Sequence, residues 1–168
     1  MNRIKLSENF YLDEFTRSET AARNGITINV TEGSEVYINL KRLCTYILQP
    51  LRDNLGPVHV LSGYRPASIN KLIGGAKKSQ HITGQAADIV VSNRTPLEVA
   101  KWIYANCEDY DQIINEFGQW VHVSVSTPDQ WPRNQIITAV KKPRLLQKPK
   151  TIYVAGLSSI EEAMRLAS

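Results

Sequence analysis

Cysteine is scarce in this chain, which contains Cys44 and Cys107 and no others. Neither lies in a C-x-x-C pair or beside other residues that commonly bind metals, so a cysteine-based metal or redox site is not expected. Both fall on the apolar faces of expected helices, where a buried free thiol is the ordinary outcome. The search for chemistry therefore turns to other side chains.

Long apolar segments are also missing. Nowhere do 18 apolar residues follow one another, so the sequence predicts no membrane-spanning helix. The first residues, MNRIKLSENFYLDEF, lack the apolar stretch of a secretory leader. We therefore expect synthesis in the cytoplasm without a signal peptide, and action on a cell wall would require release or export by other means.

Acidic residues are the minority charge, because 20 Lys and Arg stand against 16 Asp and Glu, a net charge of +4. Much of the excess lies in the segment 141–150. Such a run is usually a solvated, partly flexible segment, and docking on an anionic wall or on nucleic acid is the alternative. The run lacks the interleaved aromatics that stack on bases, so nucleic acid is the less favoured partner.

The chain of 168 residues is long enough for one hydrophobic core and too short for two ordinary domains. Apolar residues at three- and four-residue spacings predict a helix over 34–55, capped by Ser34 and kinked or divided at Pro50. A capping box at Thr95 predicts a second helix that ends near Cys107. A third, short helix is expected near the end of the chain, over 159–167.

Short β-rich runs lie between these helices, at 58–61, 87–91, 112–116 and 120–126. The last run alternates, with His122 on a polar, accessible face and valines on the other, as in an antiparallel strand with one buried side. A hairpin turn at Gly118-Gln119 would place Glu116 and His122 on adjacent strands.

Helices that precede and separate the strands, without regular βα alternation, indicate an α+β fold with a small antiparallel sheet and flanking helices. We expect residues 1–130 to form the main domain. Residues 131–168 would be a C-terminal extension with a basic loop, packed on the same domain, in which 136–154 form either a hairpin or a mobile tail.

Histidine is scarce as well, with three residues in the chain. His59 lies in an apolar run and is expected to be structural. His81 is followed seven residues later by Asp88, with Gly84 between them for a tight turn. A catalytic zinc site uses three protein ligands and leaves one position for water, and His122 could be the third ligand. By spacing alone, an ordinary surface pair of His and Asp is the commoner explanation of these residues.

One motif changes that balance. The residues Ser79, His81, Gly84, Ala86 and Asp88 match S-x-H-x-x-G-x-A-x-D, and WVHV at 120–123 matches a later W-x-H element. In these motifs the sequence resembles the zinc DD-peptidases, which include D-Ala-D-Ala carboxypeptidases, vancomycin-resistance dipeptidases and phage L-alanyl-D-glutamate endolysins. The segments LSENFYLDEF, SGYRP and GGAKKSQH are similar to those of the short bacterial and phage members.

The resemblance runs from about Leu6 to Ser126 and implies a hedgehog/DD-peptidase-like fold. It also implies a Zn2+ cofactor held by His81, Asp88 and His122, with peptidoglycan stem peptides as substrate. We expect the protein to be a monomer.

The resemblance further implies roles for residues around the metal. Arg65, in SGYRP, matches an arginine that stabilises the oxyanion during hydrolysis, and an exposed turn arginine is the alternative. Ser79 matches a residue beside the substrate. Trp120 and Trp131 are candidates for a wall that contacts the peptide stem or a sugar ring, with core packing as the commoner role of such residues.

The general base departs from the family pattern. Several members carry Asp or Glu three residues before the last zinc histidine, and here that position is Gln119, which cannot accept a proton from water. Glu116 is the best substitute, because it is expected on the neighbouring strand, where burial would raise its pKa toward a useful range. Asp111 and Glu108 are weaker alternatives.

These observations favour a zinc peptidase that cuts peptidoglycan stem peptides, either as a D-Ala-D-Ala carboxypeptidase or as an endopeptidase of the L-Ala-D-Glu type. The alternative is a non-catalytic module that keeps the fold and the zinc but only binds the cell wall. Gln119 would then be the mark of lost catalysis.

Overall fold

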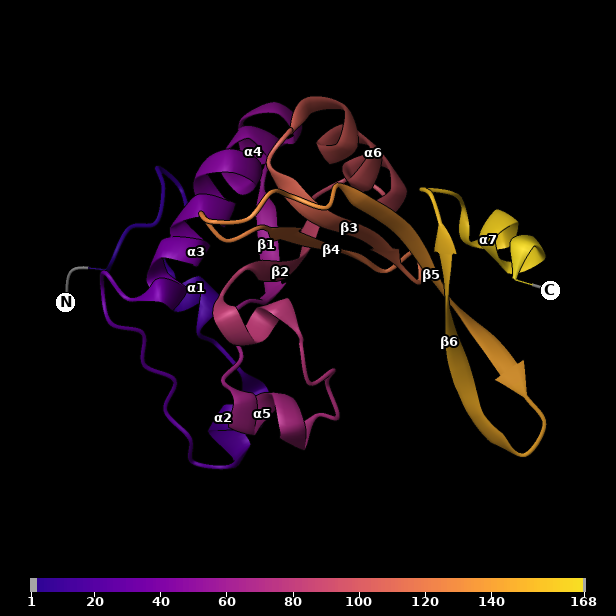
Figure 1. The fold of residues 1–168 in the computed structure, drawn as a ribbon, viewed down its shortest axis with the longest axis horizontal. Coiled ribbons are helices and arrows are strands. Elements are labelled where there is room, and N and C mark those ends of the chain that lie inside the picture. Colours follow the sequence, from indigo (N-terminus) through magenta and orange to yellow (C-terminus); the bar gives the residue numbers. More distant parts are fainter. Residues whose placement is uncertain (1–2, 168) are drawn as a thin grey trace.

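The computed structural model describes residues 3–167 and shows a six-stranded sheet with helices on both faces (Figure 1). In spatial order the sheet is β1-β2-β4-β3-β5-β6. The strands are β1 (Val58–Ser62), β2 (Ala86–Val91), β3 (Tyr110–Glu116), β4 (Trp120–Val125), β5 (Gln135–Arg144) and β6 (Gln147–Ala155). Neighbouring strands are antiparallel except β3 and β5, which run parallel. The predicted α+β class with a mostly antiparallel sheet is confirmed.

One face of the sheet carries the hydrophobic core. The helices α3 (Glu35–Leu43), α4 (Gln49–Leu55) and α6 (Pro96–Asn106) pack on this face, and α4 and α6 lie above the sheet in Figure 1. The valines of β4 point into the core and are fully buried, as the alternation of that strand predicted. The free thiols of Cys44 and Cys107 are also buried.

The predicted helix over 34–55 forms, but Pro50 divides it. A π-helical turn, η1 (Cys44–Leu48), joins α3 to α4, and Pro50 lies in the first turn of α4. Because proline has no backbone N–H to bond to the preceding turn, widening of the helix at this point accommodates it. The Thr95 capping box at the start of α6 is also confirmed, with the Thr95 backbone N–H donating to the Glu98 carboxylate at 2.7 Å.

The structure also has short elements that the sequence did not predict. They are α1 (Leu12–Phe15), which packs against α3 and β1 with its apolar side chains in the core, α2 (Glu19–Arg23), α5 (Ala67–Leu72) and a 3-10 turn, η2 (Gln80–Thr83). In Figure 1, α2 and α5 lie below the sheet. The SGYRP segment joins β1 to α5, and His81 of the S-x-H motif lies in η2, so these connections build the surroundings of the candidate site.

Residues beyond β4 complete the sheet. Of the two possibilities for 136–154, the structure shows the hairpin, formed by β5 and β6, and β5 pairs with β3. Helix α7 (Ile160–Leu166) follows and packs against β5, with Ser159 as its cap. The division of the chain at residue 130 stays a prediction. Within residues 3–167, no helix is long and apolar enough to cross a membrane.

Candidate metal centre and active site

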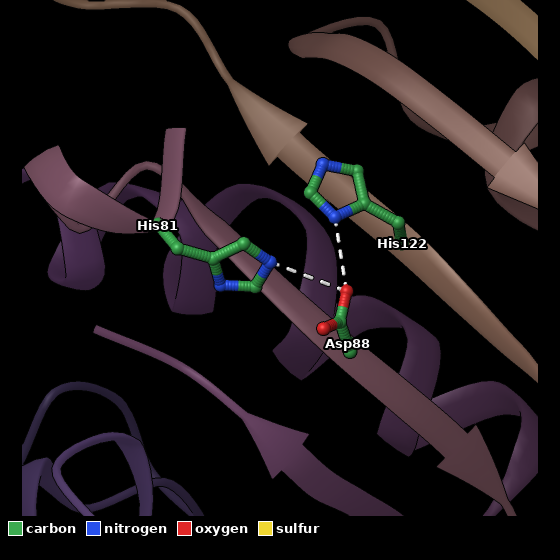
Figure 2. Close-up of side chains that lie close together, drawn as sticks. All are labelled: His81, Asp88 and His122. Carbon is green, nitrogen blue, oxygen red and sulfur yellow. Dashed lines mark hydrogen bonds and ion pairs between the residues drawn. The ribbon is translucent and has the colours of Figure 1, made fainter. Parts of the chain in front are cut away.

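His81, Asp88 and His122 converge on the face of the sheet that α2 and α5 share. Asp88 of β2 is directly opposite His122 of β4, and His81 reaches them from η2 (Figure 2). Asp88 Oδ1 lies 2.9 Å from His122 Nδ1 and 3.3 Å from His81 Nε2. The three residues therefore form one compact cluster, although they come from different elements.

The cluster has the dimensions of a zinc site. One ligand atom from each of the three residues lies within 4.8 Å of the others. Ligands about 2.0–2.1 Å from a tetrahedral zinc ion lie about 3.3 Å from each other, close to the two distances from Asp88 Oδ1. Two imidazoles and one carboxylate are also a ligand set that zinc accepts in catalytic sites, with a fourth position free. The residues present thus fit Zn2+.

His122 lies on the predicted face of β4, but the expectation that this face is accessible is wrong for His122 itself. His81 is 2% exposed and His122 is 8% exposed. Strand alternation predicts which way a side chain points, but the cover over it comes from segments distant in sequence. Here the ring of His81 packs edge-on against His122, with centroids 5.1 Å apart.

Backbone contacts from SGYRP orient His81. Its Nδ1 lies 2.7 Å from the carbonyl oxygen of Gly63, and its own carbonyl accepts a hydrogen bond from the backbone N–H of Arg65 at 3.0 Å. Because a carbonyl can only accept, His81 Nδ1 carries the proton and donates. Nε2 is therefore the nitrogen directed at Asp88. Ligating histidines usually show this arrangement, in which the ring nitrogen that does not bind the metal donates to a neighbouring carbonyl or carboxylate.

Two glycines in these segments permit the close approach. A Cβ at Gly63 would lie 2.7 Å from both Phe15 Cα and the Phe15 carbonyl oxygen. Gly84 has φ +72°, and a Cβ there would lie 2.8 Å from the backbone oxygen of Val36. The glycines of SGYRP and of the S-x-H motif are therefore required by backbone contacts that position the cluster.

The cluster holds Asp88 in its charged form. Burial opposes ionisation and is the largest single influence on the Asp88 pKa, but the hydrogen bonds and charges of His122 and His81 outweigh it. The pKa of Asp88 therefore lies well below its usual range. At neutral pH the cluster carries a carboxylate suited to a cation.

Glu116 lies at the end of β3, directly opposite Trp120. Trp120 and His122 are two residues apart on β4, so Glu116 shares their face. Burial raises the pKa of Glu116, and the charge of Asp88 adds to the rise, whereas His122 and Arg65 oppose it. The Trp120 indole also opposes it, but its Nε1 has no well-formed hydrogen bond in the described chain. The predicted placement of Glu116 and His122 on adjacent strands is confirmed.

Arg65 follows β1 and lies near both carboxylates. Burial lowers its pKa, while the charges of Asp88 and Glu116 raise it. A guanidinium stays charged in any case. Its Nε is buried and has no hydrogen-bond partner among residues 3–167. Arg65 also lines a cavity of about 240 Å³ together with Ser62, Ile69 and other residues. It therefore offers an unused donor beside the cluster.

The remaining candidates from the sequence are Ser79, Trp120 and Trp131. Ser79 precedes η2, where its carbonyl accepts from the backbone N–H of Ile82 at 3.0 Å, and no contact with the cluster is seen. Trp120 is half-buried and makes an edge contact with Phe117. Trp131 is 94% exposed, so core packing is wrong for it.

A network that the sequence did not predict braces η2. Asp111 accepts hydrogen bonds from Gln80 Nε2 at 2.9 Å and from the Arg133 guanidinium at 2.6 and 2.9 Å. Gln80 precedes His81 directly, so the network anchors the turn that carries a cluster residue. Its only sequence signal is the position of Gln80 within the motif, because Arg133 is distant in the chain. Asp111 is thus engaged in an ion pair, which disfavours it as the base.

A comparison with protein families identifies the family of this chain. A family model described as Peptidase M15 matches residues 8–124. The chain belongs to this family. The match spans well over half of the chain and includes the cluster, Arg65 and Glu116, and it confirms the resemblance inferred from the motifs. Peptidases of the M15 family depend on zinc, so the match and the cluster together indicate a zinc peptidase. A comparison with the curated proteins finds no match.

Proposed function

We propose that this M15 peptidase hydrolyses an amide bond at or near D-alanine or D-glutamate in peptidoglycan stem peptides. One observation carries the proposal: Glu116 projects from the same face of the sheet as Asp88 and His122, and Arg65 is tied to His81 through its backbone N–H. A proton acceptor, a fixed cation and three metal ligands are the parts that amide hydrolysis requires.

The role of each residue follows from its chemistry. His81, Asp88 and His122 would hold zinc, which as a Lewis acid activates water and polarises the scissile carbonyl. Glu116 takes the proton from the attacking water and passes it to the leaving amine. Arg65 donates to the substrate oxygen as negative charge develops on it. Ser79 and Trp120 are proposed to contact the peptide on either side.

Gln119 does not weaken this assignment. It is exposed in the turn between β3 and β4, and its backbone N–H donates to the Glu116 carbonyl at 2.9 Å. The raised pKa of Glu116 suits a group that must accept a proton and then release it. Glu116 is therefore the carboxylate we assign as base, in place of an acid at position 119.

The test compares wild type, Glu116→Gln and the turn control Gln119→Ala, each loaded with zinc. We measure metal content and the release of D-alanine or new amino groups from purified peptidoglycan. Glu116→Gln should keep its zinc and lose about 10²- to 10⁴-fold in kcat, the usual contribution of a general base. Gln119→Ala should retain wild-type activity.

Two results would contradict the proposal in different ways. Full activity in Glu116→Gln would place the base elsewhere. A zinc-loaded wild type that cuts no stem peptide of any common chemotype would reject the substrate class, and retention on sedimented cell walls would then favour the non-catalytic wall-binding module.

A further inference from the structure

Tyr153 belongs to the same cross-strand row as Glu116. Along this row, Trp120 of β4 pairs with Glu116 of β3, Glu116 with Ala139 of β5, and Ala139 with Tyr153 of β6. Residues paired in register project from the same face of a sheet, so all four side chains lie on the cluster's face. Ala139 has the smallest side chain in the row and is fully buried. No bulky side chain of the row therefore separates Tyr153 from Glu116.

Two further observations place the Tyr153 hydroxyl within reach of a ligand. Burial raises the pKa of Tyr153, and the charge of Glu116 adds to the rise, in agreement with their places in one cross-strand row. Tyr153 is nevertheless 60% exposed, and its hydroxyl makes no hydrogen bond within residues 3–167. At neutral pH the hydroxyl is protonated and can donate a hydrogen bond.

A cation lies next along β5. Lys141 is two residues beyond Ala139 and therefore shares its face. Its Nζ lies 4.7 Å from the centre of the Phe117 ring, and that ring contacts Trp120 edge-on at 5.6 Å. The neighbouring pair Lys142 and Lys150 points to the other face, where Lys142 donates to the Ala167 carbonyl at 2.9 Å. Of the three lysines Lys141, Lys142 and Lys150, the register of β5 and β6 therefore places Lys141 on the face of the sheet that holds the cluster.

Lys141 and Tyr153 come from a part of the chain outside the family match, which ends at residue 124. In Figure 1 the β5–β6 hairpin continues past the sheet toward the side of α2 and α5, away from α4 and α6. The hairpin therefore lies outside the matched residues and borders the face on which catalysis is proposed.

We propose that the β5–β6 hairpin forms a wall of the substrate site, where Lys141 and Tyr153 bind a carboxylate of an acidic stem peptide. The inference rests on the proposed function and adds the recognition of charge to it. Lys141 supplies the cation and Tyr153 a neutral donor, while Phe117 and Trp120 offer apolar surface to the peptide between them. Two residues along a strand span about 7 Å, so the bound carboxylate lies apart from Glu116, beyond the scissile bond.

The experiment uses two stem peptides with the same scissile bond, one with free side-branch carboxylates and one with these carboxylates amidated. Zinc-loaded full-length Lys141→Met, Tyr153→Phe and wild type are compared by steady-state kinetics. Lys150→Met is the matched control, because this lysine comes from the same hairpin but faces away. Zinc content is measured for every variant.

Lys141→Met should raise KM for the free-carboxylate peptide about tenfold, the effect of losing one charge-assisted hydrogen bond, with kcat within about twofold. Tyr153→Phe should raise KM less, about threefold, because it removes a neutral donor. Lys141→Met should match wild type on the amidated peptide, because amidation removes the charge that Lys141 recognises. Lys141→Arg should restore KM, and Lys150→Met should change nothing.

Unchanged kinetics for both hairpin variants on both peptides would overturn the inference, and so would an equal loss for Lys141→Met on the amidated peptide. Failure of the proposed function is seen separately, as the absence of cleavage by wild type. Titration calorimetry of the zinc-loaded protein with the acidic peptide then decides the inference. Weaker binding by Lys141→Met than by wild type supports it, and equal binding or none overturns it.

Discussion

The two sides of the proposed site are built in opposite ways. On the cluster side, His81 and His122 are buried, and His81 is held by backbone groups of SGYRP. On the hairpin side, β5 pairs with β3 only as far as Ala139, and beyond that point β5 and β6 pair only with each other. The turn of the hairpin at Leu145 and Leu146 is almost fully exposed.

The difference separates two tasks. Metal ligands must keep a fixed geometry to within a few tenths of an ångström, and tight backbone contacts provide this. Recognition of a substrate's charge tolerates a more exposed support, and such segments can vary in reach without disturbing the chemistry. Changes on the cluster side should therefore affect metal and fold together, whereas changes on the hairpin side should affect affinity alone.

The largest effect is expected from removal of a cluster ligand. His81→Ala and His122→Ala should weaken zinc binding by more than about a hundredfold, since even the loss of an outer partner costs about 10- to 100-fold. Peptidase activity should fall to background in both variants. Metal analysis after dialysis and peptide cleavage assays measure the two effects, and a chelator should give the same loss in wild type, reversed by added zinc.

His59→Ala is the matched control for these variants. His59 is exposed on the outer strand β1, where its Nε2 lies 3.0 Å from Ser92 Oγ. The His59→Ala variant should bind zinc and cleave peptides as wild type does. A His81→Ala protein that retains one zinc per chain and cleaves normally would mean that the cluster is not the metal centre.

A smaller effect is expected at Gly63, which supports the cluster without belonging to it. A Cβ there would meet the backbone of Phe15, which cannot give way as a flexible side chain would. Gly63→Ala should cost about 1–3 kcal/mol of unfolding free energy by overpacking. Because the Gly63 carbonyl accepts from His81, zinc affinity should also fall about 10- to 100-fold.

Gly156→Ala separates these two consequences. Gly156 has φ +91° and open space around it, so alanine strains the backbone there without a clash near the cluster. It should lose stability but keep zinc affinity. Urea unfolding and competitive zinc titration give the two quantities. Equal zinc affinities for Gly63→Ala and wild type would show that the Gly63 carbonyl does not control the ligand.

Local patterns predicted most of the cluster side. His81 and Asp88 belong to one motif, and the alternation of β4 assigned His122 its face, so the positions of all three follow from short-range rules. The caps at Ser34 and Thr95 were predicted for the same reason. The burial of His122 was missed, because the segments that cover it are remote in sequence.

The hairpin side could not be predicted in this way. The row that joins Glu116 to Tyr153 depends on the parallel pairing of β3 with β5, and no local pattern encodes which strand becomes a neighbour. The sequence therefore left residues 136–154 as hairpin or tail. Likewise, the pairing of Asp111 with Arg133 depends on how the chain returns after β4.

The Asp111 network joins the two sides and should produce the smallest effect. It ties Gln80, beside His81, to Arg133, which lies just before β5. Burial acts most strongly on the Asp111 pKa and raises it, but the bonds from Arg133 and Gln80 outweigh burial and leave the pKa below its usual value. A carboxyl with a lowered pKa in the folded state stabilises the fold above the pKa of the unfolded chain, about 3.9. This stability is lost as the pH falls through the folded pKa.

Asp111→Asn should therefore lower the unfolding free energy at pH 7 by about 1–2 kcal/mol, a modest loss because water can solvate the half-exposed Arg133. As the pH falls below about 4, Asp111 becomes protonated and wild type loses its extra unfolding free energy, so the curves of unfolding free energy against pH for wild type and Asp111→Asn converge. Urea unfolding between pH 3 and pH 7 measures this. Asp13→Asn is the control, since Asp13 pairs with Arg3 in an exposed position and should change stability little. Parallel curves for wild type and Asp111→Asn would mean that the ionised Asp111 carboxylate does not stabilise the fold through Arg133 and Gln80.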